Sequence, residues 1–148
     1  MKLLITTDKD LLLNADFCDW LIKEIRKRLI LEIDLKHVGK WQLYLEKRLA
    51  DKVLPKQKIS ADSIILQGIN NLDYIINDNS IEISVNNKIT VPNLNQVKLI
   101  SIIKLINYGN SDINGYPIFT YTFNYFAENI NAYIDKYISK IAFQKGFR

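Results

Sequence analysis

The segment from Val97 to Ile106 constrains the fold more than any other part of the chain, because it is apolar on nearly every side of a helix. Only Lys98, Ser101 and Lys104 interrupt it, and they form one narrow polar strip. A helix of this kind needs apolar neighbours on several sides. A chain of 148 residues offers limited room for a fully central helix. We therefore expect this helix to be central, either within the domain or between subunits.

This segment is part of a helix, turn, helix pattern that runs from Asn93 to Phe143. The first predicted helix spans Asn93 to Tyr108 and ends at Gly109, because glycine is favoured just after a helix C-terminus. A polar turn and the step Tyr116-Pro117 follow, and a second helix is predicted to reach about Phe143. Its apolar face has helical spacing and consists of Phe119, Phe123, Phe126, Ile130, Tyr133, Ile134, Tyr137 and Ile141.

Two amphipathic helices are predicted near the N-terminus. An apolar stripe predicts the first helix from Asp16 to about Ile33, with Asn14 or Asp16 as its N-cap. The segment from Asp34 to Gly39 interrupts the pattern, and a second helix is predicted from Lys40 to Leu54, before Pro55. The two stripes are Phe17, Leu21, Ile25 and Leu29 in the first helix, and Trp41, Leu45, Leu49 and Val53 in the second. These segments indicate a helical hairpin.

The middle of the chain favours β-structure. Two β-branched runs, Asp73–Asn77 and Ile81–Val85, are separated by the turn residues Asp78-Asn79-Ser80 and predict a β-hairpin. Lys88–Val91 is a candidate third strand, whereas Ile64–Gly68 fits either a helix or a strand. The short run Lys2–Thr7, closed by Asp8-Lys9-Asp10, predicts an edge strand or an ordered arm within residues 1–10.

These elements predict one α+β domain over residues 1–148. It contains an N-terminal helical hairpin, a small antiparallel β-hairpin or three-stranded sheet, and two C-terminal helices, with a C-terminal tail at residues 144–148. Hydrophobic residues make up 48% of the chain and charged residues 24%, as in ordinary globular proteins. The sequence contains no apolar run of the roughly 20 residues that a membrane-spanning helix needs, so no membrane association is expected.

Residues that could carry out chemistry are few. His37 is the only histidine, and with Asp34 it could form a general-base pair or half of a metal site, but catalytic zinc generally has three protein ligands. Cys18 is the only cysteine, and it could be a nucleophile activated by His37, although its neighbours Phe17 and Trp20 favour a half-buried thiol. Phosphate-loop, dinucleotide and nucleophile-elbow motifs are absent from the sequence. We expect a protein that is not an enzyme and uses no metal or cofactor.

Positive charge is concentrated in the first two predicted helices, and the formal net charge is +4. Arg26, Lys27 and Arg28 are the candidates for contact with nucleic acid. Glu24 and Glu32 are interleaved with them, which favours a solvated helix face. A small basic DNA-binding or regulatory module is therefore kept as an alternative function.

The closing region resembles small neck and tail-completion proteins of tailed bacteriophages. The resemblance rests on Leu105-Ile-Asn-Tyr-Gly109, on Gly115-Tyr-Pro-Ile-Phe119 and on the long helix that follows, and it covers about Leu105 to Phe143. Members of that family often have a hydrophobic segment ending in an aromatic or acidic residue and glycine, then a short loop, a proline-aromatic step and a C-terminal helix. Asn107 departs from the pattern, because an acidic residue is common there. Thr120-Tyr121-Thr122 also departs, since small and basic residues often follow the proline-aromatic step.

The resemblance implies a non-enzymatic virion protein that is made in the cytoplasm of the host bacterium. It would assemble as a ring at the head–tail connector, neck or tail, with other virion proteins such as portal, connector or tail proteins as partners and with DNA contact possible. Tyr108, Gly109, Pro117 and Phe119 would be structural landmarks. With the apolar helix, the resemblance gives these candidates for an oligomer interface: Val97, Ile100, Ile103, Ile106, Tyr108, Tyr116 and Phe119.

Overall fold

The structure is a computed structural model of the chain, and it describes residues 1–7, 10–144 and 146. Its fold is α+β, with the N-terminal and C-terminal helices that the sequence predicts. Asp8 and Lys9, which were expected to close the first strand, and Lys145, Phe147 and Arg148 of the expected tail lie outside the described residues. In chain order the elements are β1 (Leu3–Thr6), a short 3-10 helix (Asp10–Leu12), α1 (Ala15–Leu31), α2 (Leu35–Arg48), a second 3-10 helix (Ala50–Lys52), α3 (Ala61–Asn70), β2 (Leu72–Ile76), β3 (Ser80–Val85), α4 (Leu99–Tyr108), α5 (Ile118–Glu128) and α6 (Ile130–Gln144).

The sheet has three antiparallel strands in the order β1-β3-β2. The predicted hairpin is confirmed as β2 and β3, and the predicted N-terminal edge strand is confirmed as β1. Ile81, Ile83 and Val85 alternate with polar residues along β3 and are buried, because this face of the sheet lies on the core. The prediction of a strand at Lys88–Val91 is wrong. In the described part of the chain, that segment forms only an isolated bridge between Thr90 and Lys98.

The first helix follows the prediction closely. Asn14 is the N-cap of α1, because its side chain accepts a hydrogen bond from the Phe17 amide at 2.9 Å. The predicted apolar stripe is fully buried from Phe17 to Leu29.

The second and third helices correct the predicted boundaries. α2 begins at Leu35, so the predicted interruption from Asp34 to Gly39 is wrong beyond Asp34. The reason is that the Asp34 carboxylate caps this helix, accepting a hydrogen bond from the Lys36 amide at 2.9 Å. α2 ends at Arg48, before the predicted Leu54, and the undecided segment Ile64–Gly68 lies within α3.

The closing region contains three helices where two were predicted. α4 begins at Leu99, six residues after the predicted start, and ends at Tyr108 as expected. The long predicted second helix is divided at Asn129 into α5 and α6. The Tyr125 carbonyl accepts hydrogen bonds from both the backbone amide and the side-chain amide of Asn129, at 3.1 and 2.8 Å, so Asn129 closes the last turn of α5. The chain therefore changes direction where a continuous helix was expected.

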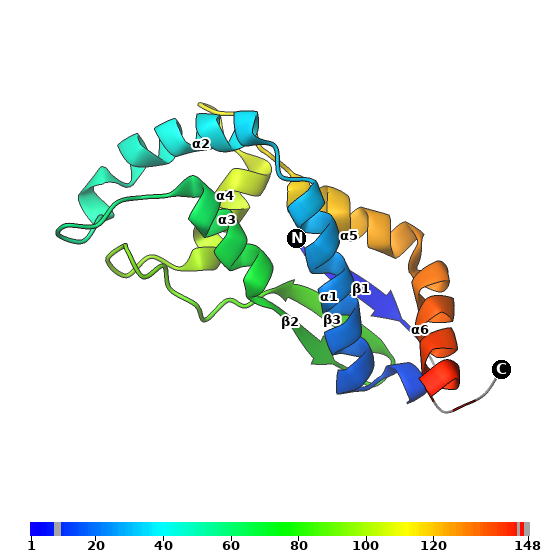
Figure 1. Cartoon of the computed structure of the whole chain (residues 1–148). Helices are drawn as coiled ribbons and strands as arrows, with labels where there is room; N and C mark the ends of the chain where they lie inside the picture. Colours follow the sequence, from blue (N-terminus) through cyan, green and yellow to red (C-terminus); the bar gives the residue numbers. More distant parts are fainter. Residues whose placement is uncertain (8–9, 145, 147–148) are drawn as a thin grey trace.

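The helices cover one face of the sheet and extend beyond it (Figure 1). α1 contacts β2 and α5 contacts β1, while α1 and α5 also pack on each other. α2, α3 and α4 form the other end of the molecule (Figure 1). Leu99, Ile102, Ile103 and Ile106 of α4 are at most 3% exposed, so the apolar helix is central within the chain itself.

Candidate functional site

The connection between α4 and α5 is a tight turn built on two glycines. Gly109 ends α4 with φ 69°, and its amide donates a hydrogen bond to the Leu105 carbonyl at 2.7 Å. A Cβ atom at Gly109 would collide with the Gly115 nitrogen, and one at Gly115 would lie 2.6 Å from the Asn107 carbonyl oxygen. Glycine is the residue that fits both the positive φ and the close backbone approach. The Gly109 landmark therefore has a geometric role in the turn.

Asn107 joins α4 to the first turn of α5. Its side chain is 1% exposed, accepts a hydrogen bond from the Thr120 amide at 3.2 Å and donates one to the Thr120 hydroxyl at 2.7 Å. Pro117, the N-cap residue of α5, contributes no side-chain cap. Asn107 therefore supplies from another helix the acceptor that an N-cap normally provides. The sequence prediction missed this role, although a polar residue in an apolar segment was a signal for it.

Tyr116 ties this connection to the turn between α1 and α2. Its hydroxyl donates a hydrogen bond to the Glu32 carbonyl at 2.7 Å and accepts one from the Asp34 amide at 2.7 Å. Burial raises the pKa of Tyr116, so the phenol keeps its proton at neutral pH. Two segments more than 80 residues apart are thus fixed to each other.

Four of the predicted interface residues belong to the core of the chain itself. Ile103, Ile106, Tyr116 and Phe119 are between 0% and 6% exposed, so they have little surface left for a second chain. Val97 and Ile100 are partly buried against the same core, whereas Tyr108 is 57% exposed. The apolar character of α4 is therefore explained mainly by packing within the domain. Any contact between subunits through this region would use Tyr108 and the exposed parts of Val97 and Ile100.

His37 lies in the first turn of α2, where a loop was expected. Its Nδ1 atom is 3.0 Å from the Asp34 Oδ2 atom, and its ring stacks on Tyr116 at 4.8 Å between centroids. The hydrogen bond from the Lys36 amide, followed by that with His37, lowers the pKa of Asp34. The pair therefore supports the start of α2.

Cys18 and His37 do not form the pair considered from the sequence. Cys18 is in the first turn of α1, whereas His37 follows the end of that helix, so the rise of the helix separates them by about 20 Å. Cys18 is 0% exposed, and burial raises the pKa of its thiol to about 11. A thiol in this environment is inert at neutral pH.

The candidate nucleic-acid residues differ in what they contact. Arg26 donates hydrogen bonds to the Ile69 and Asn70 carbonyls at 3.1 and 3.0 Å, which caps the end of α3. The Arg28 guanidinium lies 3.5 Å above the centre of the Tyr125 ring, so it packs between α1 and α5. Lys27 has a side chain that is 74% exposed and is 3.8 Å from Glu24.

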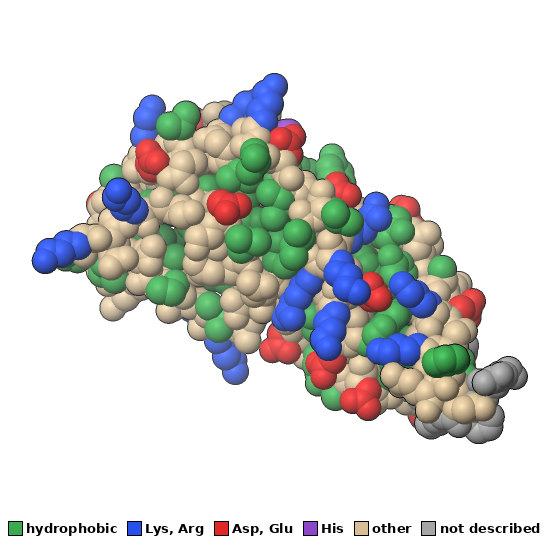
Figure 2. All heavy atoms as spheres, viewed as in Figure 1, with side chains coloured by type: hydrophobic (Ala, Val, Ile, Leu, Met, Phe, Trp, Pro, Cys, Tyr) green, Lys and Arg blue, Asp and Glu red, His purple; other side chains and the backbone are tan. Residues whose placement is uncertain are grey.

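Charged side chains of both signs lie near this part of the surface. Figure 2 shows Lys and Arg side chains over α1 and the neighbouring C-terminal helices, with acidic side chains beside them. Glu24 illustrates the mixture, because it is within 3.8 Å of Lys27 and 3.6 Å of Lys136. The basic residues thus alternate with acids and make internal contacts.

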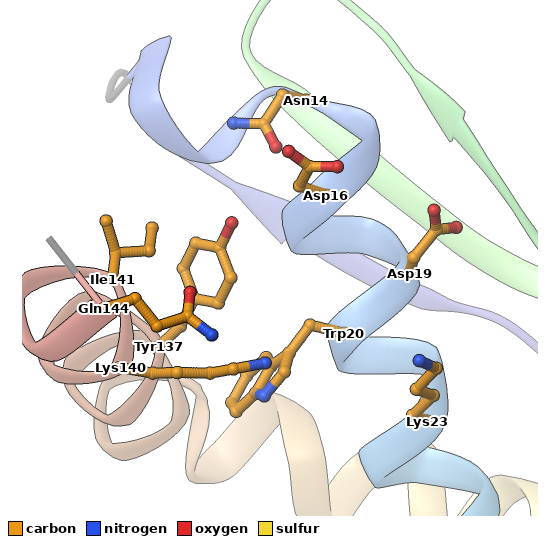
Figure 3. A pocket seen from close by; sticks show the side chains of 9 residues that line it. All are labelled: Asn14, Asp16, Asp19, Trp20, Lys23, Tyr137, Lys140, Ile141 and Gln144. Carbon is orange, nitrogen blue, oxygen red and sulfur yellow. The ribbon is translucent and has the colours of Figure 1, made fainter.

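A groove of about 580 Å³ lies between the start of α1 and the end of α6 (Figure 3). Trp20 of α1 and Tyr137 and Lys140 of α6 point toward one another across it, whereas Asp19 and Lys23 point away from α6 (Figure 3). The Tyr137 ring contacts Trp20 and Phe17, with ring centroids 5.3 and 5.0 Å apart respectively. Burial raises the pKa of Tyr137, which keeps its phenol protonated. These groups can bind a polar segment by aromatic contact, hydrogen bonds and ion pairs.

This groove was not predictable from the sequence, because its two walls are more than 100 residues apart in the chain. From the sequence, Trp20 was noted only as a neighbour of Cys18, and Tyr137 only as part of the apolar face of the last predicted helix.

The described residues contain no group of three or more His, Cys, Asp or Glu side chains that could hold a metal ion. Among those same residues, no helix is both long and apolar enough to cross a membrane. Comparison with protein-family models, curated proteins and solved structures found no match to this chain.

Proposed function

We propose that this protein is a non-enzymatic structural component of a tailed-phage particle, assembling as a ring at the head–tail connector, neck or tail. The connection between α4 and α5 carries the proposal. It places a glycine with positive φ after Tyr108, and a loop then leads to Pro117 and to Phe119 at the start of the next helix. The resemblance to neck and tail-completion proteins rests on this combination of residues. Its partners would be copies of itself and portal, connector or tail proteins.

Exposed apolar side chains support a role in assembly. Leu31 is 82% exposed and Leu35 is 79% exposed, and both lie at the corner between α1 and α2. Tyr121 of α5 is 67% exposed. Apolar side chains that gather on a surface are typical of sites where a protein meets another macromolecule. A structural protein that is buried among partners in a particle would cover such residues.

The alternative of a DNA-binding module has weaker support. Arg26 and Arg28 make contacts within the chain, and acidic neighbours accompany Lys27. Phosphate binding needs cations that are free to approach the backbone of the nucleic acid. The internal contacts of the two arginines favour a structural role for them.

The proposal can be tested on purified particles of the phage that encodes the chain. Quantitative mass spectrometry should find this protein in a fixed, small whole-number ratio to the portal protein, and an antibody should label the neck or tail. The antibody reaction with a particle lacking the gene is the control. Absence of the protein from infectious particles would contradict the proposal.

A further inference from the structure

The two outer strands of the sheet have edges that face away from β3. Thr7 donates to the Asn79 carbonyl and Asn77 donates to the Ser80 carbonyl, both at 2.8 Å. Hydrogen-bonded pairs alternate along antiparallel strands, so the backbone groups of Leu4 and Thr6 on β1 point outward, as do those of Tyr74 and Ile76 on β2. Among the described residues, no further strand pairs with either edge.

The face of the sheet opposite the helices has three rows of side chains. The register places Leu4 beside Glu82 and Glu82 beside Ile75, and Leu4 and Ile75 are 51% and 59% exposed. The same register places Thr6, Ser80 and Asn77 in the row on one side of this central row. On the other side it places Lys2, Ser84 and Asp73 in line.

Two of these rows end in side chains that are complementary in charge or in apolar character. One edge of the sheet presents Lys2 and Leu4, and the other presents Asp73 and Ile75. We propose that β2 of one copy of this chain pairs with β1 of a second copy, with Asp73 facing the second copy's Lys2 and Ile75 facing its Leu4. β1 and β2 both run antiparallel to β3, so they would meet as parallel strands and extend the sheet from copy to copy.

Asp73 has a second role at this edge. Its carboxylate accepts a hydrogen bond from the outward-facing Tyr74 amide at 2.8 Å, which occupies a donor that an incoming strand would use. Native proteins commonly protect free edges in such ways. A neighbouring carbonyl would replace the carboxylate and free Asp73 to pair with Lys2. A hollow of about 240 Å³ lined by Asp73, Ser84 and Lys88 leaves space for that lysine.

Pairing of two different edges, β2 of one copy with β1 of the next, also suits the geometry of a ring. A contact between different patches of identical chains continues from copy to copy and closes when the rotation allows, whereas β2 against β2 would stop at a dimer. This inference rests on the proposed ring assembly and names the surface that would form it. The ring could still exist with another interface, so the two proposals can fail separately.

Cysteine cross-linking tests the pairing. In a Leu4→Cys, Ile75→Cys double variant, facing Cα atoms of adjacent copies would be about 5 Å apart, which is within reach of a disulfide. Mild oxidation should give a ladder of dimers, trimers and larger species that reductant removes. The native Cys18 is 0% exposed and cannot compete. A matched control is Leu4→Cys with Leu43→Cys, because Leu43 is 65% exposed but lies on α2.

A ladder from the double variant that exceeds the control at least fivefold would support the pairing. Dimers from Ile75→Cys alone, in equal yield, would overturn it in favour of symmetric pairing through β2. Absence of cross-links in a protein whose native mass is oligomeric would overturn this inference and leave the proposed function standing. Absence of cross-links in a protein that stays monomeric, alone and with portal protein, would overturn both.

Charge reversal gives an independent test. Lys2→Glu and Asp73→Lys should each raise the protein concentration needed for assembly by roughly fivefold, and the combined variant should restore it. Thermal melting of each variant checks that the fold is intact, because Lys2 also pairs with Glu82 at 3.2 Å. If the combined variant assembles no better than the single ones, the proposed contact between Asp73 and Lys2 is wrong.

Discussion

The side chain of Asn107 in α4 caps α5 by bonding to both the amide and the hydroxyl of Thr120. The two helices are separated by a polar loop, and this buried contact fixes the direction in which the chain re-enters the core. The loop and the helix ends beside it carry the two short motifs on which the resemblance to phage neck proteins rests. Asn107 therefore supports the segment most closely connected with the proposed function.

Replacement of Asn107 by leucine should lower the free energy of unfolding by about 2 to 3 kcal/mol. The substitution removes two hydrogen bonds and leaves the partly buried Thr120 amide without its acceptor. Replacement by aspartate should cost less, because a carboxylate can accept from both Thr120 groups and is favoured near a helix N-terminus. Urea unfolding of the unmodified protein and the two variants measures the order of their free energies of unfolding. Equal losses for leucine and aspartate would contradict the capping role.

Replacement of Gly109 by alanine should lower the free energy of unfolding by at least about 2 kcal/mol. Alanine is strained at φ 69°, and its Cβ would meet the backbone of Gly115 and Ile113. Gly39→Ala is the matched control, because a Cβ there has open space in the middle of α2. The control should gain roughly 0.5 to 1 kcal/mol from higher helix propensity. Thermal melting that finds the two variants alike would count against the turn geometry.

Parts of the fold could be predicted because they depend on local patterns. The stripe of Phe17, Leu21, Ile25 and Leu29 has the period of a helix, and Ile81, Ile83 and Val85 have the period of a strand. Both sets are buried as expected. The end of α4 was also predictable, because the chain takes a positive φ of 69° at Gly109, which glycine adopts without strain.

Other parts depend on contacts that a local pattern does not contain. An edge strand or arm was predicted at Lys2–Thr7, but no local pattern shows that it pairs with β3 some 80 residues away. Lys88–Val91 was wrongly given as a candidate third strand. Gly39 suggested a break, but one glycine costs a helix only about 1 kcal/mol, and the Asp34 cap and buried Trp41 stabilise α2. The groove was also missed because it depends on a contact distant in the sequence: Trp20 and Tyr137 meet only through the packing of α1 on α6. The interface candidates Ile103 and Ile106 in α4 are apolar because they pack in the core of the same chain.

Arg26 and Lys27 should respond differently to replacement by methionine. Arg26→Met should lower the free energy of unfolding by about 1 to 2 kcal/mol, because it removes two charged hydrogen bonds at the end of α3. Lys27→Met should change it by less than about 0.5 kcal/mol, since that side chain is 74% exposed. Chemical denaturation measures both. Equal stability of the variants would contradict the cap.

Lys27 makes the DNA-binding alternative testable without loss of the fold, because its side chain is exposed. In a gel-retardation experiment with duplex DNA, Lys27→Gln should bind as the unmodified protein does, with at most weak and salt-dependent retardation. The reason is that we assign no phosphate contact to the face of α1 that carries Lys27. Loss of a tight complex in Lys27→Gln, with an unchanged melting temperature, would favour the DNA-binding module.

Cys18 should be unreactive in the folded protein at pH 8 and should react rapidly with a thiol reagent in denaturant, because it is 0% exposed. Its pKa is raised from 9.0 to about 11 in the folded state. The fold therefore favours the protonated thiol, so this contribution to stability is present below pH 9 and is lost as the pH rises toward 11. Cys18→Ala should show a smaller decline in stability over that range. An equal decline in both proteins would show that ionisation of Cys18 does not contribute to the loss of stability at high pH.

Native mass spectrometry of the purified protein is the most direct test of the proposed ring assembly. We expect a single closed assembly of several copies, with a mass that is a whole-number multiple of 17.3 kDa for the protein alone, or that multiple plus the mass of the portal protein when the two are mixed. Leu4→Lys with Ile75→Lys should reduce that mass to the monomer if the proposed edges form the ring. A mass of 17.3 kDa for the unmodified chain at every concentration and with every virion partner would contradict the proposed ring.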